Sequence, residues 1–298
     1  MTRRPSTTRD VTGAQDEQLD LDSPDVIVQL VRYTRLENLP SIVAYPNAGA
    51  LDTATVATLL GCGVERLQAI QRALRRAVAT AADDLLKDTQ FVRAARMLPF
   101  RPGETVLAVG DSNTSDALSW AEILAQVLAR VRPLGPHFVN AAVSADTSAD
   151  LIARFHLIAA HQPNWLLIMI GTNDARRHGP NGLARMTSIG ETRRNLRALA
   201  ALAHKTNARL VLITPPPIID ERVRAHPPWA EASITWHAAE VAGVAEAVHR
   251  TGGLVVDAHG ALLEGATGSW VSDDGVHPTL AGQQRIVHAL VTGLVAHA

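Results

Sequence analysis

The sequence predicts an α/β fold: a three-layer α/β/α sandwich around a five-stranded, mainly parallel sheet, preceded by a small all-helical module. Short apolar segments suited to strands alternate with stretches of helical length. Because a parallel crossover needs a long connection, usually a helix, this alternation favours a parallel sheet covered on both faces. The five apolar segments are residues 105–109, 138–139, 165–170, 209–213 and 254–256.

Helical periodicity is clearest ahead of the first of these strands. Apolar residues three, four or seven positions apart share one face of a predicted long amphipathic helix: Leu67, Ile70, Leu74, Val78 and Leu85. A similar stripe near the C-terminus predicts a final helix that lies on the sheet: Val287, Leu290, Val291 and Leu294.

Two composition shifts divide the chain. Residues 1–24 are polar and lack apolar periodicity, so we expect a flexible tail. Residues 97–103 contain two prolines and a glycine, which break the helical pattern. We therefore predict a tail at 1–24, a helical N-terminal module at 25–98 and an α/β domain at 99–298.

The overall composition limits the classes of partner. A formal net charge of -1 gives no protein-wide positive field for nucleic acid or an anionic membrane. Cys62 is the single cysteine, so no disulfide forms within the chain. The first residues lack an apolar signal-peptide core, and the apolar run 165–170 is far shorter than the roughly 20 residues of a membrane span. We expect a cytoplasmic protein without a membrane partner.

Polar residues that carry chemistry follow three of the predicted strands. Open α/β sheets place functional groups in loops at the carboxyl ends of their strands. Gly110, Asp111 and Ser112 follow the first strand, and Asn173 with Asp174 follows the third. The fifth strand leads, after a loop, into residues 272–278, which contain Asp274 and His277. These loops supply a nucleophile, a hydrogen-bond donor, an acid and a base.

With these loops in place, the chain resembles the SGNH (GDSL) hydrolases. That family carries a GDS serine, a glycine block, a GxND asparagine and a DxxH pair, and all four blocks occur here in family order. Residues 139–148 are similar to the second block of the bacterial thioesterase/lysophospholipase branch. The resemblance covers about residues 104–298 and implies a flavodoxin-like hydrolase domain that acts on a small-molecule acyl ester.

The resemblance also implies a catalytic triad. Ser112 would be the nucleophile, and His277 would be the base that a serine hydroxyl needs near neutral pH. Asp274 would accept a proton from one imidazole nitrogen, so that the other nitrogen faces Ser112. The neighbouring carboxylate of Asp273 is a rival for that role, although the DxxH spacing selects Asp274.

The family stabilises negative charge on the substrate carbonyl oxygen with three donors, which form an oxyanion hole. By resemblance these are the backbone amides of Ser112 and Ala145 and the side-chain amide of Asn173. Ala145 stands where the family usually has glycine. If that loop requires a positive φ, the extra β-carbon costs about 1 kcal/mol or displaces the donor.

Each of these motifs also has a purely structural interpretation. Asp and Ser after a glycine are frequent at helix entries, so the GDS triplet alone is weak evidence. We expect Asp146 and Thr147 to hold the second loop through side-chain to backbone hydrogen bonds. The long loop after residue 217 either packs rigidly on the sheet or lines the acyl pocket with Ile218, Ile219, Trp229 and Trp236.

No cofactor is required by this chemistry, and no metal site is expected. The histidines on predicted helices lack the paired spacing of metal ligands: His156, His161, His204, His237 and His249.

The helical module leaves several functions open. Residues 53–74 loosely fit a helix-turn-helix, and four arginines add local positive charge: Arg66, Arg72, Arg75 and Arg76. We favour a cap on the hydrolase domain or a homodimer contact over binding of nucleic acid. The leading prediction is thus a serine esterase or thioesterase. The alternatives are a DNA-binding regulator with a ligand-sensing domain and an acyltransferase with the same triad.

Overall fold

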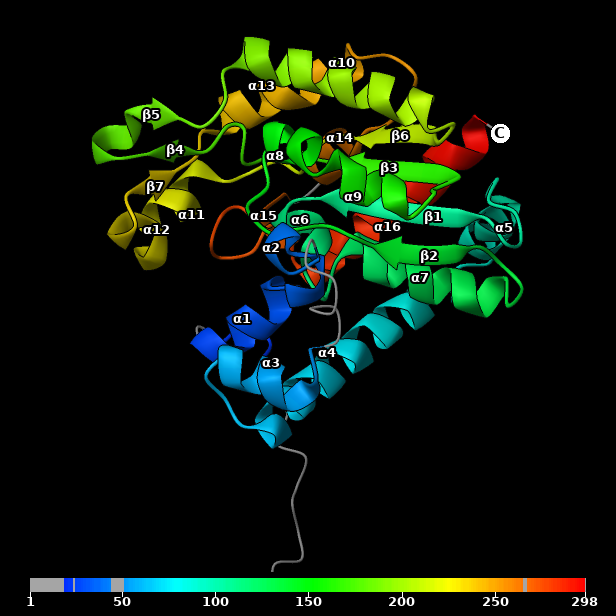
Figure 1. Ribbon diagram of the computed structural model, residues 1–298, viewed down its shortest axis with the longest axis horizontal. Coiled ribbons are helices and arrows are strands. Elements are labelled where there is room, and N and C mark those ends of the chain that lie inside the picture. The colour runs from blue at the N-terminus through cyan, green and yellow to red at the C-terminus, as the bar shows by residue number, and fades with distance from the viewer. Residues whose placement is uncertain (1–18, 24, 44–50, 265–266, 298) are drawn as a thin grey trace, which may run out of the picture.

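A parallel sheet forms the centre of the molecule. The computed structural model describes residues 19–23, 25–43, 51–264 and 267–297. The sheet has the order β2-β1-β3-β6-β8, and every ladder in it is parallel (Figure 1). The predicted five-stranded sheet is confirmed, with strands β1 (Thr105–Gly110), β2 (His137–Asn140), β3 (Trp165–Met169), β6 (Arg209–Ile213) and β8 (Leu254–Val256).

Helices cover both faces of the sheet, because alternate strand residues point to opposite sides. Leu166 and Ile168 of β3 pack with one set of helices, whereas Leu167 packs with the other. The first set is α8 (Ser148–Ala153), α9 (Phe155–Ala160), α10 (Ile189–Lys205) and α13 (Ala238–His249). The second set is α7 (Trp120–Val131), α14 (Ala258–Leu263) and α16 (Leu280–Ala296). The three-layer α/β/α prediction is confirmed.

A small lobe stands beside this sandwich. Three two-residue strands form an antiparallel sheet in the order β5-β4-β7: β4 (Arg177–His178), β5 (Ala184–Arg185) and β7 (Ile234–Thr235). The lobe also holds η2 (Pro180–Gly182), α11 (Asp220–Ala225) and α12 (Pro227–Glu231) (Figure 1). Strands this short show no alternation, so the sequence analysis did not predict them.

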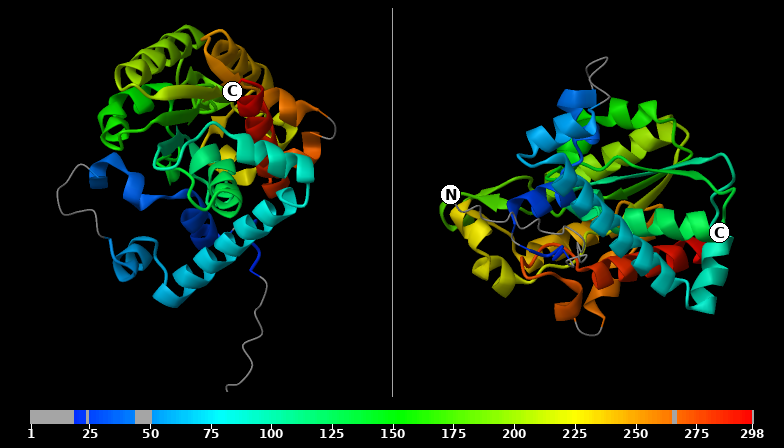
Figure 2. Two further views of the ribbon diagram at one scale, coloured as in Figure 1. Left: turned by 90° about the vertical axis from the view of Figure 1, so that its right-hand side faces the viewer. Right: turned by 90° about the horizontal axis from the view of Figure 1, so that it is seen from below.

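The N-terminal helices share a core with the α/β part. They are α1 (Val26–Tyr33), η1 (Leu36–Asn38), α2 (Pro40–Val43), α3 (Thr53–Leu59), α4 (Val64–Leu85) and α5 (Thr89–Met97). Helix α4 contacts α7 and α16 and lies along the outside of the sandwich, in cyan in Figure 2. Ile70, Leu74 and Val78 of its apolar stripe are buried in the same cluster as α7 and α16. The stripe therefore covers the α/β part of its own chain.

Helices α3 and α4 have the spacing that suggested a helix-turn-helix. Residues 60–63 connect them, and Ala57, Leu60 and Leu67 form a small core between them. Arg66 pairs with Asp25, and the other predicted arginines are exposed. DNA binding stays the less favoured alternative.

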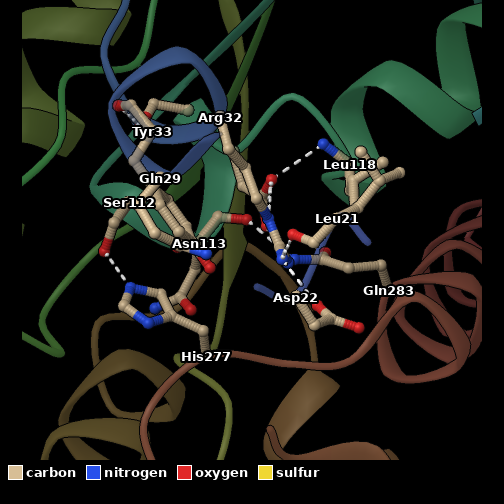
Figure 3. A network of polar contacts seen from close by, with 12 residues as sticks. Leu21, Asp22, Gln29, Arg32, Tyr33, Ser112, Asn113, Leu118, His277 and Gln283 are labelled. Atoms are coloured by element: carbon tan, nitrogen blue, oxygen red, sulfur yellow. Dashed lines mark hydrogen bonds and ion pairs between the residues drawn. The ribbon is translucent and has the colours of Figure 1, made fainter. Parts of the chain in front are cut away.

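A buried ion pair joins helix α1 to the α/β part. The Arg32 guanidinium donates to both carboxylate oxygens of Asp116, at 2.9 Å each, and both side chains are buried (Figure 3). Arg32 also donates to Asp22 and to the carbonyl of Leu21. Ordered contacts therefore begin inside the segment predicted as a tail, of which residues 1–18 and 24 lie outside the described residues.

We expect Arg32→Ala to lower the free energy of unfolding by about 3–5 kcal/mol, because it leaves the Asp116 carboxylate buried without its partner. Chemical denaturation of purified variants would measure the loss. Arg66→Ala is the matched control, because it breaks the exposed pair with Asp25 and is expected to cost far less. Equal losses in the two variants would contradict a structural role for the buried pair.

Candidate active site

The first strand delivers Ser112 to the start of a short helix. Helix α6 (Ser112–Ser115) begins directly after Asp111, whose carboxylate accepts a hydrogen bond from the Asn113 amide at 3.0 Å. A side chain at Gly110 would collide with the carbonyl oxygen of Met169, so only glycine fits there. The sequence Gly110-Asp111-Ser112 therefore leads into a helix. Ser112, the first residue of that helix, is partly exposed at the carboxyl edge of the sheet.

Ser112, His277 and Asp274 form a continuous chain of hydrogen bonds. Nε2 of His277 lies 2.9 Å from Oγ of Ser112, as the dashed line in Figure 3 marks. Nδ1 of His277 lies 2.5 Å from Oδ2 of Asp274. The other oxygen of Asp274 accepts from the Ser272 hydroxyl and from the amides of Val276 and His277. The rival Asp273 is exposed.

The surroundings of Asp274 and His277 determine which protonation state each side chain favours. Burial opposes the ionised form of Asp274, but His277 and the backbone amides outweigh it and hold the pKa of Asp274 below its usual value. Burial likewise opposes the charged form of His277, yet the Asp274 carboxylate raises the pKa of His277 above 6.5. Because a carboxylate only accepts, neutral His277 carries its proton on Nδ1 and presents Nε2 as an acceptor to Ser112.

The other two predicted oxyanion donors lie on neighbouring loops. The Asn173 side-chain amide donates to the carbonyl of Asp146, at 3.1 Å, next to Ala145 in the chain. Arg176 donates to the oxygen of the same side chain, at 3.1 Å, and so fixes its orientation. Ala145 is exposed and has φ 71°, in the left-handed region. The loop therefore does require the positive φ that glycine adopts without strain.

Hydrogen bonds connect the loops that carry these groups. The Ser115 hydroxyl lies 2.8 Å from that of Ser144, which joins helix α6 to the loop of Ala145. The Asn113 side chain donates to Oγ1 of Thr172 at 3.1 Å, which joins α6 to the loop of Asn173. The three loops thus hold one another in register.

Helix α8 forms hydrogen bonds to the loop that contains Asn173 and Asp174. The Asp174 carboxylate accepts from the Ser148 amide and hydroxyl and from the hydroxyl of Thr192. Thr147 caps α8 through a reciprocal pair of contacts with Asp150, including side-chain to backbone bonds of the kind expected. Asp146 instead pairs with the side chain of Arg154 at 2.6 Å.

The predicted substrate-binding residues occupy two kinds of position. Ile218 and Trp236 are buried in a hydrophobic cluster, and Trp236 Nε1 donates to the carbonyl of Thr172 at 3.0 Å. Trp229 is half-buried, and its Nε1 donates to the carbonyl of Asp274 at 2.9 Å. The ring of Trp229 lies 6.5 Å from the imidazole of His277, measured between ring centroids. Substrate binding by these residues stays a prediction.

No sequence motif predicted the aromatic residue that lies beside the imidazole. Tyr33, at the end of helix α1, lies 4.7 Å from His277 between ring centroids. It belongs to none of the four family blocks and lies far ahead of Ser112 in the sequence. No local pattern marks such a contact, because it depends on how α1 docks.

Two structural features bear on metals and membranes. Within the described ranges, no three potential metal-binding side chains of histidine, cysteine, aspartate or glutamate gather around one point. Among the helices that the structure describes, none combines the length and the apolar character of a membrane span.

The parallel sheet covered by helices on both faces is the fold of the SGNH esterases. The chain belongs to the GDSL-like lipase/acylhydrolase family, whose sequence model matches residues 108–285, more than half of the chain. This agrees with the SGNH resemblance of the four blocks, and the activity is that of a carboxylic ester hydrolase.

The individual relatives include two esterases and an α/β hydrolase enzyme. Esterase TesA of Pseudomonas aeruginosa is 29% identical over 192 residues, which are 62% of this chain and 84% of that protein. The acetylxylan esterase Axe2 of Geobacillus stearothermophilus matches with 25% identity and a TM-score of 0.53, over 65% of this chain and 95% of that one. LAE5, an α/β hydrolase enzyme from the Lake Arreo metagenome, matches with 26% identity and a TM-score of 0.50, over 65% and 96%.

We expect Ala145→Gly to raise the free energy of unfolding by about 0.5–1 kcal/mol. Relief of a left-handed alanine is worth about 1–2 kcal/mol, which exceeds the added flexibility of the unfolded chain. Chemical denaturation would measure the gain. Ala142→Gly in the same loop is the control, because Ala142 is buried without a positive φ and its replacement should destabilise. A loss of stability in both variants would show that φ at residue 145 carries no strain.

Proposed function

We propose that this protein hydrolyses acyl esters through a Ser112–His277–Asp274 triad and a covalent acyl-enzyme. The observation that carries the proposal is the hydrogen-bond chain from the Ser112 hydroxyl through both imidazole nitrogens to the Asp274 carboxylate. An ionised Asp274 supports the imidazolium that forms when His277 takes the serine proton.

In the proposed mechanism, Oγ of Ser112 attacks the ester carbonyl carbon while Nε2 of His277 takes the hydroxyl proton. The carbonyl oxygen becomes an oxyanion, to which the amides of Ser112 and Ala145 and the side chain of Asn173 donate. Collapse breaks the bond to the alcohol oxygen, which takes the proton from His277. Water then attacks the acyl-enzyme with His277 as base and releases the acid.

The substrate we propose is an ester with a small or medium acyl group. Axe2 is named for the removal of acetyl groups, and TesA is named simply an esterase. Hydrolysis of a thioester and transfer of the acyl group to another alcohol would use the same residues. The assignment to hydrolysis of an oxygen ester therefore rests on these relatives. Product analysis with and without added alcohol acceptors would separate hydrolase from acyltransferase.

Ser112→Ala should lower kcat/KM by about 10³-fold or more, because it removes the hydroxyl that forms the acyl-enzyme. A panel of p-nitrophenyl esters of rising chain length would measure activity and acyl preference together. Ser119→Ala is the control, since Ser119 is buried on the same segment and its hydroxyl makes no hydrogen bond within the described residues. Turnover that survives in Ser112→Ala would refute the proposal.

We expect kcat/KM to rise with pH through an inflection above 6.5, because His277 must be neutral to accept the serine proton and its pKa is raised. Asp274→Asn should move this inflection to lower pH, since burial then acts without the opposing carboxylate, and should lower the plateau by about 10³- to 10⁴-fold. Rate profiles from pH 4 to 9 would test both. Asp273→Asn should leave the profile unchanged, and an equal shift there would overturn the assignment to Asp274.

A further inference from the structure

Helix α1 brings an aromatic ring to the catalytic imidazole from outside the family region. The Tyr33 ring lies 4.7 Å from that of His277, with 40° between the ring planes. Tyr33 precedes the residues 108–285 that match the family model. Burial raises the pKa of its phenol well above 10, so the side chain stays neutral where an esterase works.

Polar contacts on both sides of Tyr33 fix its place. Its carbonyl oxygen accepts from the hydroxyls of Ser115, at 3.3 Å, and Ser144, at 2.5 Å. The preceding residue, Arg32, forms the buried pair with Asp116, and its carbonyl accepts from the amide of Ala117. Figure 3 shows Arg32 and Tyr33 on one turn of the helix above Ser112 and His277.

The segment after Tyr33 is attached to the same loops. Arg35 donates to the carbonyl of Ser115 at 2.8 Å and pairs with Glu122. The Asn38 side-chain amide donates to two backbone carbonyls, those of Asn140 and Ala142, at 3.0 Å each. The ring of Tyr33 is therefore held against the imidazole by contacts to the loops of Ser112 and Ala145.

A second ring reaches the imidazole from the small lobe. Trp229 of α12 lies 6.5 Å from His277 and is held by its hydrogen bond to the Asp274 carbonyl. The two rings come from different parts of the fold, since α1 belongs to the N-terminal helices and α12 to the small lobe (Figure 1). Tyr33 and Trp229 are both half-buried as whole residues.

We infer that Tyr33 and Trp229 form the walls of a leaving-group subsite that selects esters whose alcohol carries a ring, aromatic or sugar. This inference rests on the proposed function, because the departing alcohol oxygen takes its proton from Nε2 of His277 and must therefore pass beside that imidazole. A ring in the alcohol gains contact area and ring stacking against neutral aromatic walls, whereas an open-chain alcohol gains less.

The test compares benzyl acetate with allyl acetate, whose alcohols have similar acidity and differ in the ring. Both give the same acetyl-enzyme, so slower deacylation or a loss of active protein cancels in the ratio of their kcat/KM values. We expect the wild type to favour benzyl acetate, and Tyr33→Ala to reduce that preference by roughly 3- to 10-fold. Tyr33→Phe should retain it, because the ring remains.

Matched controls separate a subsite from a general disturbance of α1. Leu30→Ala alters an exposed residue of the same helix and should leave the preference unchanged. The ratio of benzyl acetate to benzyl hexanoate should also stay constant in Tyr33→Ala, because the proposed subsite holds the alcohol and not the acyl group. An unchanged benzyl preference in Tyr33→Ala, or a shift in the acyl ratio instead, would overturn the inference. If Tyr33→Ala does not fold by circular dichroism, Tyr33→Met tests the same loss of the ring.

A binding measurement tests the subsite without turnover. In the Ser112→Ala background, benzyl alcohol should bind more weakly by roughly 3- to 10-fold when Tyr33 is also replaced by alanine, as followed by NMR titration. Equal affinities would overturn the subsite. Ester hydrolysis that persists in Ser112→Ala would instead refute the triad, and the benzyl alcohol titration would still decide the role of Tyr33.

Discussion

The parallel sheet is the constraint on which the site depends. Since all five strands run the same way, the loops after β1 and β3 and the segment that follows β8 meet at one edge. The strand order changes direction at β1, between β2 and β3, and α/β sheets bind their ligands at such a switch point. Ser112 and Asn173 lie on the two loops that flank it. Hydrogen bonds from Asn113 and Ser115 then join these loops to that of Ala145.

A second constraint is the docking of the N-terminal helices. Their apolar residues continue the core of the sandwich, and the Arg32–Asp116 pair adds direction to this packing because a guanidinium and a carboxylate fit in one geometry. Asp116 lies four residues after Ser112, so the pair couples helix α1 to the loop that carries Ser112, the nucleophile that we propose. The charges also reach His277, whose pKa responds chiefly to burial and Asp274 and to a smaller extent to Asp116 and Arg32.

The alanine at residue 145 shows how a local departure from the family pattern is tolerated. Its backbone N–H is retained, and the surrounding contacts of Asp146 and Thr147 hold the loop in place although φ is positive. Strain of this kind persists where neighbouring structure determines the backbone more strongly than the residue itself does.

The sequence by itself determined the order and type of the five strands, the long helix after residue 64, and the spacing of Asp274 and His277. These features depend on local periodicity and on motifs within a few residues of one another. Only the tertiary structure decided that α4 covers its own chain, that two-residue strands form a second sheet, that residue 145 has a positive φ, and that Tyr33 lies against His277. The contacts of α4 and Tyr33 and the pairing of the short strands join segments that are distant in the sequence, so no pattern within one segment encodes them. The φ of residue 145 depends on the contacts that hold its loop.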